Sequence, residues 1–121
     1  MTTAVAADRV ASIYRDTMRL AEAARGYFDR DGVEARTAMT PELRAAIATE
    51  SVRVTARLLA VVSWVLTQQE MAAGNAIGRS NILDNVIDEP PLSGKLPEPA
   101  RRIAESTRAL YADVRSLAQG V

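Results

Sequence analysis

The residue types that most often perform chemistry are scarce in this sequence. The chain has 121 residues and contains neither histidine nor cysteine. Zinc sites built from Cys and His, cysteine nucleophiles and histidine-based acid–base catalysis are therefore excluded. Asp84, Asp88 and Glu89 cluster in sequence, but they have no His, Lys or metal-ligand partner at a useful spacing. We interpret them as solvated loop carboxylates, with a weak divalent-cation site as the alternative, and expect no enzyme, cofactor or metal.

Charge and hydropathy limit the possible partners. Fifteen positive and fifteen negative residues give a net charge of zero, which argues against nucleic-acid binding. The apolar run Leu58–Leu66 has nine residues, whereas a membrane span needs about 20. The segment Met1–Val5 has neither a basic region nor a long apolar run, so no signal peptide is visible. Together with the lack of cysteine, this predicts a cytoplasmic protein.

A charged strip in the middle of the chain is the remaining candidate for a functional site. Glu50, Arg53 and Arg57 are each separated by about one helical turn. Glu–Arg pairs at this spacing stabilise a helix by about 0.2–0.5 kcal/mol. The alternative is a strip that faces a partner, because arginine suits protein interfaces. Trp64 lies on the same flank as Arg57, and we expect it to be buried or at an interface.

Three periodic segments must position these residues. The chain has 22 alanines and only five aromatic residues, which favours helix. We predict helices over residues 5–28, 41–73 and 98–118, with a turn and loop over 29–39 and an irregular loop over 75–97. Thr40-Pro41-Glu42 is a typical helix start, and Gly74-Asn75 a typical end. The sequence predicts one domain, residues 1–121, of all-α class: an antiparallel three-helix bundle with a long central helix.

The predicted central helix is apolar on nearly every side. Behind the stripe that should form the core, its third side carries small uncharged residues. A helix that is apolar all round must be covered all round, and two neighbours cannot easily cover about 50 Å of it. We therefore predict a homodimer with this helix near the interface; the alternative is that the other helices and the long loop cover it. The partner or dimer interface is placed on Glu50, Arg53, Ala56, Arg57, Ala60, Ser63, Trp64 and Thr67.

The middle of the chain resembles a known family. The segment from Glu50 to Leu59, followed by Ser63-Trp64-Val65-Leu66, is similar to the core of the regulator of CtrA degradation (RcdA) family of alphaproteobacteria. A second, weaker similarity covers Leu96-Pro97, Ser106, Leu110-Tyr111 and Val114–Leu117. The resemblance covers the second and third predicted helices well and the first only by its helical pattern.

The resemblance implies a small, dimeric three-helix bundle without an active site. It also implies a role as an adaptor in regulated proteolysis by ClpXP during the cell cycle, with protease-associated regulators and cargo proteins as partners. Glu50, Arg53, Arg57 and Trp64 carry over as residues of the family pattern. The alternative is a helical dimeric scaffold or regulator that binds another protein target, such as a transcription factor.

Overall fold

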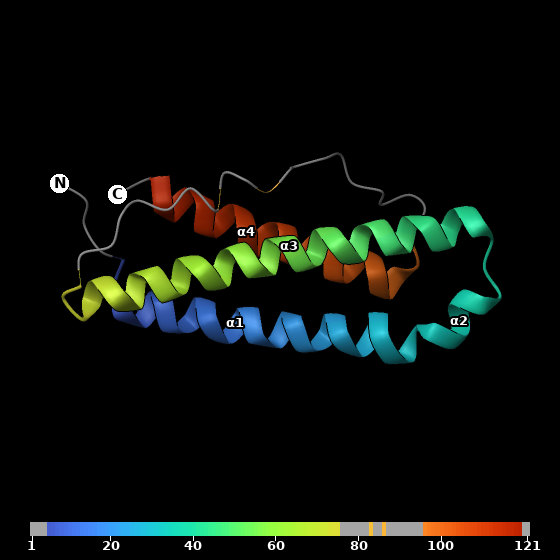
Figure 1. The fold of residues 1–121 in the computed structure, drawn as a ribbon, viewed down its shortest axis with the longest axis horizontal. Helices are drawn as coiled ribbons and strands as arrows, with labels where there is room; N and C mark the ends of the chain where they lie inside the picture. The colour runs from blue at the N-terminus through green and yellow to red at the C-terminus, as the bar shows by residue number, and fades with distance from the viewer. Residues whose placement is uncertain (1–4, 76–82, 84–85, 87–95, 120–121) are drawn as a thin grey trace.

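Most of the described chain is helical. The structure, a computed structural model, describes residues 5–75, 83, 86 and 96–119. Its elements are α1 (Ala7–Arg25), the π-helix η1 (Gly26–Asp31), α2 (Val33–Thr37), α3 (Pro41–Ala72) and α4 (Glu98–Gln119) (Figure 1). The described residues contain no strand. The predicted all-α class with a long central helix is confirmed for this part of the chain.

Helix α3 begins and ends where local signals place it. The Thr40 hydroxyl oxygen accepts a hydrogen bond from the Leu43 N–H at 3.2 Å, and Pro41 fills the first helical position. At the other end Gly74 has φ 88°, the left-handed conformation that favours glycine. The predicted range of 41–73 differs from the observed helix by one residue. Helix α4 likewise differs from the predicted 98–118 by one residue.

The segment after α1 differs from the prediction. A turn over 29–32 and a loop to Met39 were expected, but the chain remains helical through η1 and α2. The Gly32 N–H donates to the Tyr27 carbonyl, five residues earlier, at 2.8 Å, which is the hydrogen-bond pattern of a π-turn. Phe28 in this segment is buried in the core. Because tertiary packing routinely overrides local propensity, the Asp and Gly residues do not end the helix here.

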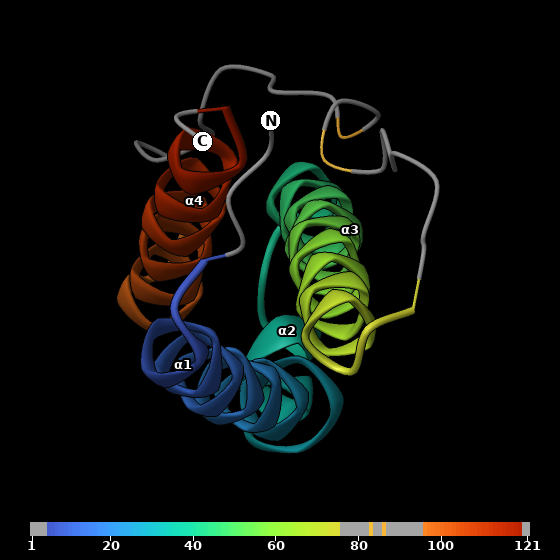
Figure 2. The same cartoon turned by 90° about the vertical axis from the view of Figure 1, so that its left-hand side faces the viewer.

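The three long helices pack side by side around two hydrophobic clusters (Figures 1 and 2). One cluster joins the start of α1 to the later parts of α3 and α4, through Val10, Val65 and Val114. The other joins the end of α1 to the starts of α3 and α4, through Ala24, Ile47 and Ala100. Helix α1 therefore runs antiparallel to the other two, whereas α3 and α4 are parallel.

The expectation of an antiparallel arrangement thus holds for α1 only. Parallel neighbours need a connection as long as the helix itself. Helix α3 has 32 residues, or about 48 Å at 1.5 Å per residue. The 25 residues from 73 to 97 that separate α3 from α4 can reach about 80 Å when extended, so the chain length allows the return. Apart from Leu83, Val86, Leu96 and Pro97, the predicted irregular loop from 76 onwards lies outside the described residues.

Candidate protein-interaction surface

The charged strip of α3 lies inside the chain. Glu50 is 2% exposed and Arg57 is 4% exposed. The Arg57 Nη1 lies 3.0 Å from the Glu50 Oε1, and it also donates to the Thr107 hydroxyl oxygen on α4 at 3.2 Å. That hydroxyl donates in turn to the Ala104 carbonyl at 3.0 Å. The network satisfies a buried ion pair with hydrogen bonds and fixes α3 against α4.

Two more residues of the predicted interface belong to the core. Ala60 and Trp64 are buried in the cluster that contains Val10, Leu83 and Tyr111. The Tyr111 hydroxyl donates to the Leu83 carbonyl. Trp64 is therefore in the core, one of the two places expected for it. Because the chain itself encloses Glu50, Arg57, Ala60 and Trp64, these four side chains hold the fold together and are not available to a partner that binds the outside.

The other four predicted interface residues reach the surface to different degrees. Ala56 is exposed, whereas Arg53, Ser63 and Thr67 are partly buried. The Arg53 Nη1 lies 3.5 Å from the Glu50 Oε2, at the edge of the buried network. The Thr67 hydroxyl donates to the Ser63 carbonyl, one turn earlier, at 3.0 Å. The eight predicted residues therefore do not form one continuous surface.

A more exposed apolar face lies on the side of α3 that points away from the core. Val52, Leu59 and Leu66 are 70%, 63% and 52% exposed. Their spacing of seven residues aligns them along the helix. The residues between them on this face are uncharged. We call the whole set the outer α3 face: Ala45, Ala48, Val52, Thr55, Ala56, Leu59, Val62, Ser63 and Leu66.

The sequence contained the signal for this face. The seven-residue spacing of Ala45, Val52, Leu59 and Leu66 is visible in the printed chain, and the charged residues between them fall on other sides of a helix at 100° per residue. The prediction favoured the flank with arginine and tryptophan, because these types are enriched at binding hot spots. In the structure that flank turns inward towards α4 and Leu83, and the aliphatic flank turns outward.

The apolar surface continues from α3 onto α1. A pocket of about 310 Å³ lies between the two helices, and its lining includes Met18, Ala21, Thr55, Leu59 and Val62. Met18 is among the exposed large apolar side chains, as is Tyr14 one turn before it. Figure 2 shows α1 and α3 as neighbours along this side. The outer α3 face is thus part of a wider apolar surface on two helices.

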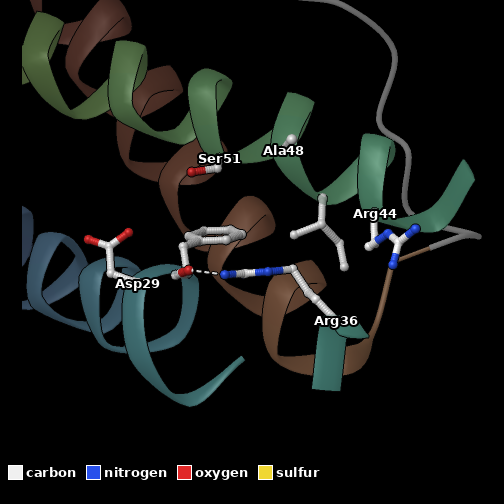
Figure 3. A pocket seen from close by; sticks show the side chains of 7 residues that line it. Asp29, Arg36, Arg44, Ala48 and Ser51 are labelled. Atoms are coloured by element: carbon white, nitrogen blue, oxygen red, sulfur yellow. Dashed lines mark hydrogen bonds between the residues drawn. The ribbon is translucent and has the colours of Figure 1, made fainter. Parts of the chain in front are cut away.

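A second pocket combines charged and apolar groups where η1, α2 and α3 meet. Its volume is about 360 Å³, and we call it the α2–α3 pocket after two of the helices that line it. Figure 3 shows Asp29 and Arg44 on opposite sides of the pocket, with Arg36 between them. An Arg36 Nη2 donates to the Phe28 carbonyl. Its lining residues are Phe28, Asp29, Arg36, Arg44, Ile47, Ala48 and Ser51. The pocket could not be expected from the sequence pattern, because it depends on α2, where a loop was predicted.

The described residues contain neither a metal-binding cluster nor a membrane-spanning helix. No group of three or more Asp, Glu, His or Cys gathers there in a way that could hold a metal ion. Asp84, Asp88 and Glu89, the carboxylates weighed for a cation site, lie outside the described part of the chain. None of the described helices combines the length and apolarity required to cross a membrane. The candidate site is therefore built from the outer α3 face and the α2–α3 pocket.

Comparison with known proteins assigns the chain to a family without assigning it an activity. No curated protein matches the sequence, and no solved structure matches it either. One family model matches residues 1–121, and its description reads "Protein of unknown function (DUF1465)". Since the match covers the whole sequence, the chain belongs to the DUF1465 family of proteins of unknown function.

Proposed function

We propose that the chain is a non-enzymatic protein-interaction module: a three-helix bundle that forms a homodimer through the outer α3 face. The observation that carries the proposal is the exposure of three large aliphatic side chains, Val52, Leu59 and Leu66, on one uncharged face. Contiguous apolar surface on a folded protein marks an interaction site. Full burial of such a side chain contributes about 1.5–3 kcal/mol, so association that covers three of them in each subunit is favourable.

A second copy of the chain is the occupant that best fits this face. Large residues that recur every seven positions are typical of helices that pack along one another. Ala48, Ala56 and Ser63 lie between or beside the large residues and let a second helix backbone approach closely. A two-fold dimer presents the same face from both subunits, so each apolar stripe would meet its own copy. The stripe also has no charges that would repel one another.

We further propose that the dimer acts as an adaptor in regulated proteolysis of the ClpXP type, within cell-cycle control. The similarity of the α3 and α4 segments to the RcdA family supports this role. Glu50, Arg57 and Trp64, which belong to that similarity, are buried between helices. A shared pattern at these positions is thus a requirement of the fold, and partner recognition is assigned to the surface. The proposed location is the cytoplasm.

The homodimer is tested by size-exclusion chromatography with light scattering. The chain has a mass of 13.1 kDa, so we expect twice that mass at micromolar concentration. Leu59→Arg should give a monomer, because a charge at the centre of the interface would be buried without a partner. Ala23→Arg, at an exposed position of α1 that does not line the pocket between α1 and α3, is the matched control and should remain a dimer. A monomeric wild-type protein would contradict the proposal, and a dimeric Leu59→Arg would exclude this face.

The adaptor role is tested by affinity capture from an alphaproteobacterial lysate. Wild-type protein and the Ala23→Arg control should both enrich ClpX or cell-cycle regulators. Loss of that enrichment in Leu59→Arg would show that the dimer is required for it. If the wild-type protein enriches neither class, the adaptor role is wrong even where the homodimer is real, because the two measurements are independent.

A further inference from the structure

The α2–α3 pocket places two arginines beside buried apolar side chains. We propose that it binds the C-terminal carboxylate of a partner protein whose last residue has an apolar side chain. The inference rests on the proposed role as a protein-interaction module, because it names one chemical feature of a partner. The pocket adjoins one end of the outer α3 face, with which it shares Ala48, and its lining does not include Val52, Leu59 or Leu66.

The cations of the pocket are arranged to receive an anion. Arg36 and Arg44 both line it, and Asp29 is the only acidic residue among the lining residues, so the pocket is net positive. The hydrogen bond from Arg36 to the Phe28 carbonyl uses one of five N–H donors and holds the guanidinium in place. Arg44 is exposed and forms no ion pair within the described chain. Guanidinium groups bind carboxylates through paired, charge-assisted hydrogen bonds.

The apolar part of the pocket lies directly beside these cations. Phe28 and Ile47 are buried core residues that also line the pocket. Ala48 lies on the same wall, one turn after Arg44 on α3. A ligand that fills the pocket must therefore present a negative group and an apolar group close together.

A chain terminus meets this requirement better than an internal acidic residue. The last residue of a chain carries its carboxylate and its side chain on the same Cα, whereas Asp and Glu have no apolar side chain besides the acid. The volume of about 360 Å³ is at the small end of ligand pockets, which range from about 300 to 1,000 Å³, and suits one or two residues. The last backbone N–H of the ligand can donate to Asp29 or to the Ser51 hydroxyl, which gives these two lining residues a role.

The proposal is tested by titrating ¹⁵N-labelled full-length protein with N-acetyl-alanyl-leucine and following the backbone amide signals. We expect saturable shifts at Phe28, Ala48 and Ser51 with a Kd of about 1 mM, which corresponds to about −4 kcal/mol and is reasonable for so small a probe. The same dipeptide with an amidated C-terminus should bind at least about fivefold more weakly, because one charge-assisted interaction contributes roughly 1 kcal/mol or more. Arg44→Gln should weaken the binding of the free-acid dipeptide by a similar factor.

The controls separate the terminal carboxylate from other anions. Arg101→Gln, an exposed position on α4, should bind the probe as the wild type does. The proposal is overturned if the free acid gives no saturable shift by about 20 mM, or if the amidated dipeptide binds equally well. It is also overturned if inorganic phosphate binds as tightly as the free-acid dipeptide. The same holds if N-acetyl-glutamyl amide, which has only a side-chain carboxylate, binds as tightly. Light scattering on the same samples separates this proposal from that of the homodimer. A protein that is dimeric but does not bind the probe would refute the carboxylate site and leave the homodimer standing.

Discussion

Replacement of Glu50 by leucine is the most direct test of how α3 is held against α4. The substitution keeps a side chain of similar size but removes the carboxylate that lies 3.0 Å from the Arg57 Nη1. Arg57 would keep only its bond to the Thr107 hydroxyl and would remain a buried cation without a counter-ion. Removal of one partner from a buried ion pair costs about 3–5 kcal/mol.

We expect the loss of unfolding free energy in Glu50→Leu to lie at the lower end of that range. Arg57 lines a pocket of about 310 Å³ between α3 and α4, so its guanidinium has a short path to water once Glu50 is lost. We therefore expect a loss of about 3 kcal/mol. For 121 residues, at about 2.1 cal/mol/K per residue, the entropy of unfolding is about 0.25 kcal/mol/K. The expected fall in Tm is then about 12 °C.

Urea unfolding followed by tryptophan fluorescence measures this loss, because Trp64 is the only tryptophan and is buried. All variants are compared at one protein concentration, since dimer formation would make stability depend on it. Glu98→Gln, which breaks an exposed pair with Arg102, is the control and should change stability by about 0.5 kcal/mol or less.

A double substitution supplies the decisive comparison. Glu50→Leu combined with Arg57→Leu removes both buried charges, and apolar replacement of a buried pair is often neutral. The double variant should therefore be more stable than Glu50→Leu alone. A loss below about 1 kcal/mol for Glu50→Leu, or a double variant that is less stable than either single one, would refute a desolvated ion pair as the cause.

Three further predictions concern the core and the helix ends. Trp64→Ala should lower the free energy of unfolding by about 3–5 kcal/mol, measured in urea by far-UV circular dichroism because the variant has no tryptophan; a loss below about 1 kcal/mol would mean that the side chain is not packed in the core. Thr40→Ala should cost about 1 kcal/mol, because it removes the N-cap hydrogen bond of α3, and unchanged stability would mean that the cap does not form in solution. Gly32→Ala should destabilise by about 1–3 kcal/mol, because its Cβ would lie 2.7 Å from the Tyr27 carbonyl oxygen. Gly26→Ala is the matched control: it meets only the end of a flexible arginine side chain at 3.2 Å, so its Tm should not fall, and an equal loss in both variants would contradict the π-turn geometry.

The parts of the fold that could be predicted from sequence are those that depend on neighbouring residues. The N-cap at Thr40, the proline at position 41 and the left-handed Gly74 each act within one turn of the chain, so the ends of α3 were predicted to within one residue. Phe28 acts over a longer range. Its burial against residues of α3 and α4 is a tertiary effect, and the local sequence Asp29-Arg30-Asp31-Gly32 contains only the competing turn signal. The π-helix and α2, and with them the α2–α3 pocket, were therefore not predictable from local pattern.

The candidate surface lies on the helix that the sequence singled out, but mostly on another flank of it. Both flanks of α3 are rich in apolar residues, and charge at a spacing of three or four residues looks the same on an exposed helix as in a buried network. The position of α4 determines which flank of α3 is buried and which is exposed. The length of the connection allows α4 to run in either direction, and the contacts between α3 and α4, such as the hydrogen bond from Arg57 to Thr107, show which flank is covered. Long-range position is thus the information that a single sequence did not supply.

Helix α3 buries Glu50 and Arg57 beside its apolar core residues and exposes Val52, Leu59 and Leu66, whereas a simple surface helix keeps its charges on the solvent side and its large apolar residues inside. The inner ion pair adds little net stability when compared with apolar residues of the same size, but it constrains how α3 can be rotated against α4. In a purely apolar core, a rotation of α3 that turned Leu59 and Leu66 inward would leave no buried charge unpaired. In this protein, the same rotation would separate Glu50 and Arg57 from Thr107 and leave two charges unpaired. The buried pair therefore favours the arrangement in which Val52, Leu59 and Leu66 stay on the surface.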